Sequence, residues 1–415
     1  MKCNCSRRDF LMRGLYGMGV GAALPLVLSR TSAALAAQAI AGTSVEKHPE
    51  RILVVVELSG GNDGLNTVVP YGDPAYYRAR PKLGIRERDA ITVAPGMGFH
   101  PSMVGFERLY KDGHLAVVHG CGYDRPSLSH FSSMDFWHTG APNTGESLGW
   151  LGRLADATYD PATRNMIVNL GTAQSLAVRS QRHSPLVFDD PSRFRREGSD
   201  DEKRAIVTLS RQAAPTSNAT LDFLTATAAN AAESSDFVRQ ASAEYRTPVD
   251  YGIGGGLGGN LQRVAALIAA GMPTRLYYVT YAGNSFDTHV QQADLHGRLL
   301  MYTADAIRGF VEDMDRLGRG DQVAVMVFTE FGRRVEENGS LGTDHGTATP
   351  MFLVGKGVKG GFYGTHPSLT DLDAGNLKMT TDFRRVYATA IKEWLGYDDA
   401  RAILKGEFQT LATFA

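Results

Sequence analysis

Two pairs of aspartate and histidine are the side chains of this sequence best suited to metal chemistry. Asp287 and His289 are two positions apart, and Asp344 and His345 are adjacent. Carboxylate and imidazole together suit divalent ions, because the carboxylate supplies negative charge and the imidazole adds affinity for Zn or Mn. One such pair occurs readily by chance, whereas two pairs in one chain favour a metal site.

A carboxylate and a hydroxyl that suit the same chemistry occur earlier in the chain. Asp63 lies among three glycines in residues 59–66, and glycine lets the backbone approach a ligand closely. Asp63 is also well placed to cap a following helix. Ser127 and Ser129 lie close to His130, where a serine could act as a nucleophile or simply begin a helix.

These polar groups follow apolar runs that predict buried strands. Continuous β-branched runs ending at or near glycine are typical of parallel strands covered on both faces. Functional groups on such a sheet gather at the carboxyl ends of the strands. The runs occupy residues 51–58, 115–119, 276–280, 323–328 and 350–354.

Helical patterns separate these strands. Apolar residues at three- and four-residue spacing predict helices over 261–270 and 296–317, so we expect an α/β fold whose mostly parallel central sheet is flanked by helices. The polar stretch 188–247 has helical spacing and is interpreted as a helical cap insertion. The glycine-rich residues 252–259 follow no strand and lack the Lys-Ser/Thr ending of a phosphate loop, which favours a hinge. We therefore predict a single domain over residues 50–415.

The first 39 residues have the three parts of a signal peptide. Arg7 and Arg8 lie in a Ser-Arg-Arg-Asp-Phe-Leu run, an apolar stretch covers 14–28, and small residues that suit cleavage follow. A membrane span needs about 20 apolar residues, and this stretch is shorter and interrupted by glycine and proline. The paired arginines predict a twin-arginine signal, a twin-arginine translocase as the partner during export, and a periplasmic or secreted protein.

Composition excludes several other classes of protein. The net charge is −1, no basic stripe indicates a nucleic-acid surface, and no later segment is long and apolar enough to span a membrane. Cys3 and Cys5 belong to the leader, so Cys121 remains alone and cannot close an internal disulfide. Stability must come from a hydrophobic core, for which 415 residues suffice.

The polar segments together resemble the DUF1501 family. That family groups twin-arginine-exported bacterial proteins of unknown function with the alkaline-phosphatase-like superfamily. The resemblance implies an alkaline-phosphatase/sulfatase-like fold and covers nearly all of the chain after the leader. It lies in the blocks 58–67, 129–131, 286–289, 330–333 and 342–346.

The resemblance also implies roles for individual residues. Site residues of the superfamily follow a set order: an Asp after the first strand, a Ser or Thr nucleophile, an Asp with a nearby His, an Asp-His dipeptide and a last His. The matching positions are Asp63, Ser129, Asp287 with His289, and Asp344 with His345.

The match to the superfamily has departures. Asp287 and His289 are two apart, where the superfamily has four, and His366 has the position of the last His without its motif; His296 is a substitute. Ser127 is the second choice of nucleophile. Neither Cys-x-Pro-x-Arg nor Ser-x-Pro-x-Arg occurs, so the modified nucleophile of sulfatases is not expected and phosphoryl transfer is favoured.

The leading hypothesis is a metal-dependent hydrolase of phosphate esters with one or two divalent ions, Zn, Mn or Mg. Ser129 would attack phosphorus, and Arg333 would hold the ester oxygens unless it forms an ion pair with Glu330. One alternative is a non-catalytic protein that binds an envelope component, a polysaccharide or a partner protein. Another is a metal that only stabilises loops. The predicted ligands are Asp63, Asp287, His289, Asp344 and His345.

Overall fold

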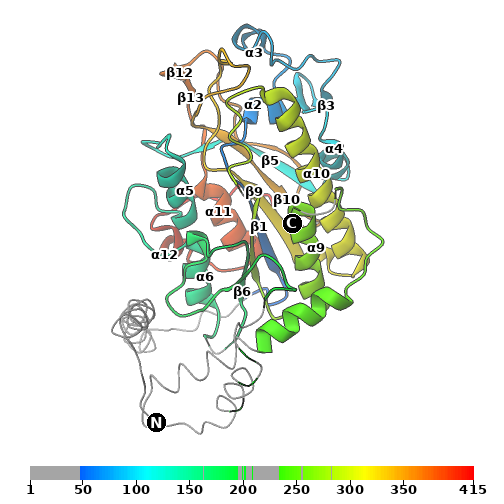
Figure 1. The fold of residues 1–415 in the computed structure, drawn as a ribbon. Coiled ribbons are helices and arrows are strands. Elements are labelled where there is room, and N and C mark those ends of the chain that lie inside the picture. Colours follow the sequence, from blue (N-terminus) through cyan, green and yellow to red (C-terminus); the bar gives the residue numbers. More distant parts are fainter. Residues whose placement is uncertain are drawn as a thin grey trace, which may run out of the picture. The chain divides into compact units, whose positions relative to one another are not determined.

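Nine of the described strands form one sheet, and β1 (Ile52–Leu58) lies near its middle (Figure 1). Every residue of β1 is buried, as expected for a strand covered on both faces. β1 pairs in parallel with β8 (Leu276–Tyr281) on one side and with β9 (Val323–Phe328) on the other. Beyond β8 lie β6 (Ile167–Leu170) and β7 (Leu186–Phe188), also parallel.

The other half of the sheet contains a reversal of strand direction. β10 (Thr349–Val354) runs antiparallel to β9 and to β5 (Leu115–Gly122), whereas β11 (Gly361–Tyr363) and β14 (Thr381–Asp382) are parallel to β5. The sequence predicts the strand at 350–354 but not its direction. Because β10 is reversed, its first residues lie at the sheet edge where β1, β5, β8 and β9 end.

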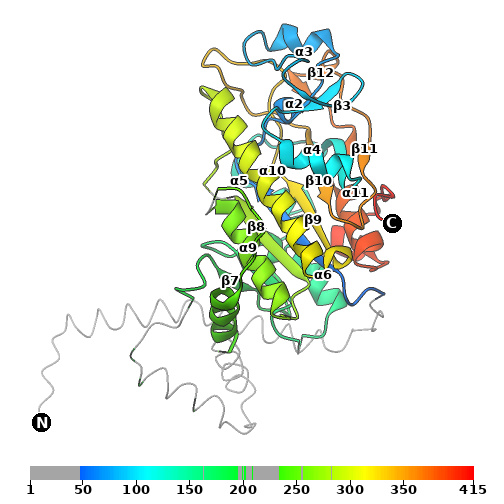
Figure 2. The same cartoon turned by 90° about the vertical axis from the view of Figure 1, so that its right-hand side faces the viewer.

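Helices cover both faces of the sheet, so the fold is an α/β structure with a mostly parallel central sheet, as predicted (Figure 2). One face packs against α4 (Val104–Lys111), α9 (Gly256–Ala269) and α10 (Gln292–Arg316). The predicted helices at 261–270 and 296–317 correspond to α9 and α10.

The opposite face packs against a second set of helices. Alternate β1 residues point to the two faces, Val54 to the α9 and α10 side and Val55 to the α5 and α6 side. The helices on this second face are α5 (His130–Thr139), α6 (Trp150–Thr158), α11 (Arg384–Thr389) and α12 (Ala400–Leu404).

Short elements complete the fold. Three of them make a small sheet of their own in the order β2-β4-β3, and β12 pairs with β13. They are α2 (Gly64–Thr67), β2 (Val68–Val69), α3 (Pro74–Ala79), β3 (Ile91–Ala94), β4 (Met97–Phe99), η1 (Leu176–Val178), η2 (Gly320–Gln322), β12 (Leu372–Asp373), β13 (Asn376–Leu377) and the π-helical η3 (Ala390–Trp394).

This computed structural model describes residues 47–161, 163–194, 199, 201, 208, 233–253, 256–281 and 283–415. Residues 44–195 and 234–415 form one compact unit, and a second unit, 1–43 with 196–233, lies almost wholly outside the described residues. The predicted signal and most of the predicted insertion at 188–247 therefore lie outside them too. None of the described helices is long and apolar enough to cross a membrane.

Candidate metal centre

Five chain segments meet at the edge of the sheet where β1, β8 and β9 end. They come from the loops after β1, β8 and β9, from the start of α5 after β5, and from the approach to β10. The turn after β1 requires glycine, because Gly60 has φ +120° and an added Cβ would lie 2.5 Å from the Asp287 backbone nitrogen. This close approach lets the loop after β8 lie directly on the turn after β1.

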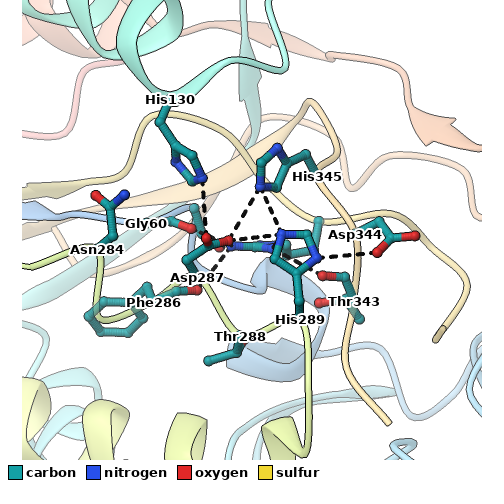
Figure 3. A network of polar contacts seen from close by, with 12 residues as sticks. Gly60, His130, Asn284, Phe286, Asp287, Thr288, His289, Thr343, Asp344 and His345 are labelled. Carbon is teal, nitrogen blue, oxygen red and sulfur yellow. Dashed lines mark hydrogen bonds and ion pairs between the residues drawn. The ribbon is translucent and has the colours of Figure 1, made fainter. Parts of the chain in front are cut away.

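Three histidines converge on Asp287 at this edge (Figure 3). The Nε2 atoms of His289 and His345 are 2.9 Å apart, and they lie 3.0 Å and 3.3 Å from Asp287 Oδ1. His130 Nε2 lies 3.5 Å from Asp287 Oδ2. His130, Asp287 and His345 offer ligand atoms that all lie within 4.8 Å of one another, a grouping that could hold a metal ion. We call His130, Asp287, His289 and His345 the metal centre.

Each of these histidines is held through its other ring nitrogen. His345 Nδ1 lies 2.8 Å from the Leu128 carbonyl oxygen, which can only accept, so Nδ1 carries the proton and Nε2 of the neutral ring has a lone pair. His130 Nδ1 lies 2.9 Å from Glu330 Oε1, and His289 Nδ1 lies 3.2 Å from Asp344 Oδ1. Donation to these acceptors directs all three Nε2 lone pairs to the same place, as in sites where a carboxylate orients a metal-binding histidine.

The centre has the chemistry of a cation site. His130 Nε2 is buried without a hydrogen-bond partner, which is costly for a polar atom unless something binds it. Two facing Nε2 lone pairs at 2.9 Å repel unless a proton or a cation lies between the rings. Three imidazole nitrogens and one carboxylate form a donor set that suits zinc and similar divalent ions.

Neighbouring charges and burial shift the pKa values of the residues in the metal centre. The hydrogen bond with Glu330 raises the pKa of His130, and burial lowers the pKa of His345. Burial alone would raise the pKa of Asp287, but the hydrogen bond and charge of Arg333 outweigh burial and lower the pKa. Asp287 is therefore an anion beside three imidazoles, paired through Oδ1 with Arg333, while its Oδ2 faces His130.

Glu330 fixes the start of α5 to the loop after β9. Its side chain is only 1% exposed and accepts hydrogen bonds from the Gly60 backbone N–H at 2.8 Å and the Thr329 hydroxyl at 2.9 Å, besides His130. The Ser133 hydroxyl on α5 donates to the Glu330 carbonyl at 2.6 Å. These contacts hold the His130 ring in place.

Arg333, predicted to hold ester oxygens, has its N–H groups engaged inside the protein. The guanidinium is fully buried and donates to the backbone carbonyls of Gly60, Gly61 at 2.5 Å and Thr343 at 3.0 Å. It also donates to Asp287 Oδ1 at 2.7 Å and contacts His289 Nε2 at 3.3 Å. In this structure Arg333 therefore joins the loops and pairs with Asp287.

Asp63 is not brought to the metal centre. Its Oδ2 accepts from Arg80 at 2.6 Å and from Gln292 at 2.5 Å, and its Oδ1 caps α2 by accepting from the Leu65 N–H at 3.2 Å. Burial would raise the pKa of Asp63, but the Arg80 charge outweighs burial and lowers the pKa. A metal ion was the predicted partner of the Asp63 carboxylate. In the structure, the positive charge beside this carboxylate is the Arg80 guanidinium.

The other predicted residues have distinct positions. Asp344 contacts His289 Nδ1 and Asn338, so it orients a ligand instead of meeting the Nε2 atoms. His366 packs against His119 with ring centroids 5.2 Å apart, and His296 Nε2 lies 2.8 Å from Asn62 Oδ1. Neither histidine joins the metal centre.

Ser129 is the residue that precedes α5 and is exposed. Its hydroxyl makes no capping hydrogen bond to the helix, although serine in this position usually does. Ser127 Oγ instead accepts from the Ser129 backbone N–H at 3.2 Å. The Ser129 hydroxyl is thus left out of helix capping, next to His130.

The sequence did not predict His130 as a ligand or Glu330 as the residue that holds it. Both residues stand inside the blocks that resemble DUF1501, so position in a block was the available signal. Nothing in their spacing indicated that residues 200 positions apart form a pair.

The solved structures that match this chain are distant in sequence. The lipoteichoic acid synthase LtaP from Listeria monocytogenes is 9% identical, with 90% of this chain and 80% of that chain covered and a TM-score of 0.43. The C-terminal periplasmic domain of EcEptC from Escherichia coli, in complex with Zn, is 11% identical, with coverages of 76% and 78% and a TM-score of 0.36. A protein in the alkaline phosphatase superfamily from Vibrio parahaemolyticus is 8% identical, with coverages of 86% and 70% and a TM-score of 0.36. Similarity at this level assigns no activity.

No curated protein matches the sequence. The family model described as "Protein of unknown function (DUF1501)" matches residues 50–406, which is nearly the whole of the chain after the predicted leader. The resemblance found in the five sequence blocks is therefore confirmed, and the chain belongs to the DUF1501 family.

Proposed function

We propose that this protein is a metal-dependent hydrolase of phosphate esters that uses Ser129 as its nucleophile. The observation that carries the proposal is the convergence of three histidine Nε2 atoms and the Asp287 carboxylate, with the uncapped hydroxyl of Ser129 on the residue that directly precedes His130. The ligand set that we assign is His130, Asp287, His289 and His345. This set of ligands is enough for one ion. Asp63, the predicted ligand outside the set, forms an ion pair with Arg80.

The ligands remain accessible from solvent. The side chains of His289 and Asp287 are 37% and 29% exposed, so an ester can reach the centre from outside. A bound divalent ion would act there as a Lewis acid toward a phosphoryl oxygen.

Ser129 lies at the amino-terminal end of α5, where free backbone N–H groups favour negative charge. Attack of its hydroxyl oxygen on phosphorus forms the new P–O bond as the P–O bond to the ester alcohol breaks. The serine proton is lost to solvent or a base, and the alcohol leaves after taking up a proton. Water then cleaves the phosphoserine, so the sum is hydrolysis of the ester with Ser129 regenerated.

A metal measurement combined with an ester screen tests this function. Protein purified without chelator should contain about one divalent ion per chain, as expected for a single four-ligand site. It should hydrolyse nitrophenyl phosphate mono- or diesters in preference to nitrophenyl sulfate. Ser129→Ala should abolish turnover with metal retained, whereas Ser132→Ala, at an exposed position on the same helix, should have no effect.

Each outcome of that test has a meaning. Phosphorylation found by mass spectrometry on residue 129 supports the proposed nucleophile, and phosphorylation on Ser127 would reassign it. Full metal occupancy with no turnover of any ester would favour the binding role. Protein that takes up no metal would overturn the hydrolase.

We further propose that the protein is exported by the twin-arginine route. The support is the Ser-Arg-Arg-Asp-Phe-Leu run with its apolar and small-residue continuation. Replacing Arg7 and Arg8 by Lys should leave the chain in the cytoplasmic fraction, whereas Arg13→Lys should not. Normal export of the double variant would refute this route.

A further inference from the structure

Large apolar side chains are exposed around the metal centre. Phe131 is 85% exposed, Val290 is 62% exposed and Leu128 is 38% exposed. We call these three residues the apolar rim. Single exposed apolar residues are ordinary on a protein surface, whereas several around one polar site mark a binding surface.

Each member of the apolar rim is tied to a metal-centre residue by the chain itself. Phe131 directly follows His130, and Val290 directly follows His289, so their Cα atoms lie about 3.8 Å from those of the ligands. The Leu128 carbonyl accepts the hydrogen bond from His345 Nδ1. The apolar rim therefore borders three of the four assigned ligands.

A buried aromatic side chain, Phe331, also contacts the centre. The Phe331 ring packs against His130 and His345, with centroid distances of 4.9 Å and 4.7 Å. Phe331 also lines a cavity of about 330 Å³, within the range of small-molecule sites. That cavity is lined by buried Tyr123 and Leu377 but also by charged residues, and it contains none of the metal-centre residues. The centre thus has an aromatic ring against two of its histidines in addition to the exposed apolar rim.

We infer that the substrate is an amphiphile, a phosphate ester whose alcohol carries a long hydrocarbon chain. The anionic phosphate fits the metal centre, and the hydrocarbon fits the apolar rim, because each part meets surface of its own polarity. This inference rests on the proposed function and adds the class of alcohol. A protein partner would not require the apolar side chains to alternate along the chain with metal ligands.

Binding of alkylphosphonates tests the inference without requiring turnover. Zinc-loaded protein should bind dodecylphosphonate, below its micelle concentration, far more tightly than methylphosphonate in calorimetry. The gain should be up to about 4-fold for each methylene that is buried. Phe131→Ser and Val290→Ser should each reduce dodecylphosphonate affinity about 10-fold and leave methylphosphonate affinity unchanged.

Matched controls exist elsewhere on the surface. Val104 and Ile253 are 45% and 62% exposed and are not adjacent to any residue of the centre, so Val104→Ser and Ile253→Ser should not change binding. Affinity independent of chain length would overturn the inference, as would rim variants that change only the oligomeric state.

Hydrolysis assays beside the binding measurements separate this inference from the proposed function. Hydrolysis of methyl, butyl and dodecyl phosphates at equal efficiency would refute the amphiphile while supporting the hydrolase. Phosphonate binding could instead depend on chain length and be lost in Phe131→Ser while no ester is turned over. That result would support the amphiphile and refute the hydrolase.

Discussion

His289 and His345 face one another through their Nε2 atoms at 2.9 Å, and the Nδ1 atom of each is hydrogen-bonded on the far side of its ring, to Asp344 and to the Leu128 carbonyl. With both Nδ1 protons committed, the two Nε2 lone pairs face one another, and a proton or a cation between the rings relieves their repulsion.

His345→Ala should weaken zinc binding by more than about 100-fold, because loss of a ligand exceeds the effect of losing a residue that orients one. His289→Ala should behave similarly. Calorimetric zinc titration measures both effects, with His48→Ala as the control outside the centre. Unchanged affinity in both variants would show that the metal, if bound, lies elsewhere.

Glu330→Gln should lower zinc affinity by about 10- to 100-fold while the fold is retained, because the charge that orients His130 is removed. Glu336→Gln is the matched control, since Glu336 is exposed in the same loop. Circular dichroism of the apo proteins confirms folding. Equal affinity in the two variants would remove Glu330 from the account of the site.

Arg80→Met should destabilise the fold by about 3–5 kcal/mol, because it leaves the buried Asp63 carboxylate without its cation. The double variant Arg80→Met with Asp63→Leu should recover much of this loss, since replacement of a whole buried pair is far less costly than its rupture. Urea unfolding measures both free energies of unfolding. Asp63→Asn should keep the zinc stoichiometry of the parent, and a lower stoichiometry would return Asp63 to the ligand set.

Stability should fall in mild acid because of buried neutral histidines. Burial lowers the pKa of His119 and of His100 to about 4 and that of His296 to about 3, from 6.5. Between those values and 6.5 the unfolded chain binds protons that the folded chain does not. The contribution of these neutral histidines to the free energy of unfolding is therefore complete above pH 6.5 and is lost as the pH falls toward 4.

His119→Phe should reduce the loss of unfolding free energy between pH 7 and pH 5 by about 2 kcal/mol, as expected for one histidine that stays neutral in the folded state. Urea unfolding in the presence of chelator makes the comparison. His48→Gln, with 37% of its side chain exposed, is the control. An unchanged pH dependence in His119→Phe would contradict burial as the cause.

The central strands and the long helices were predictable from the sequence because burial on both faces leaves long apolar runs. The direction of β10 was not, since a strand buried on both faces has the same apolar run in either direction. Shorter strands such as β11 are only partly buried and carry a weaker pattern.

The candidate site was predictable where several signals agreed. Asp287, His289 and His345 follow or precede central strands, and the structure brings them together. Asp63 has the same local signal but a different partner, Arg80, whose position depends on the fold of residues 64–80. Arg333 suggested anion binding, yet its donors are taken by backbone carbonyls that no sequence pattern reveals.

The side chains that hold the metal centre are closed to solvent, while the ligands are partly open. Glu330 and Arg333 are 1% and 0% exposed, compared with 24% for His345 and 29% for Asp287. Glu330 and Arg333 hold the ligands in place in the folded chain. An ion could therefore exchange with the surrounding solution without unfolding of the protein. Occupancy is then governed by the free metal concentrations around the folded protein and by the affinity order of the divalent ions. Any metal found in an isolated sample would accordingly report the last solution that the protein met.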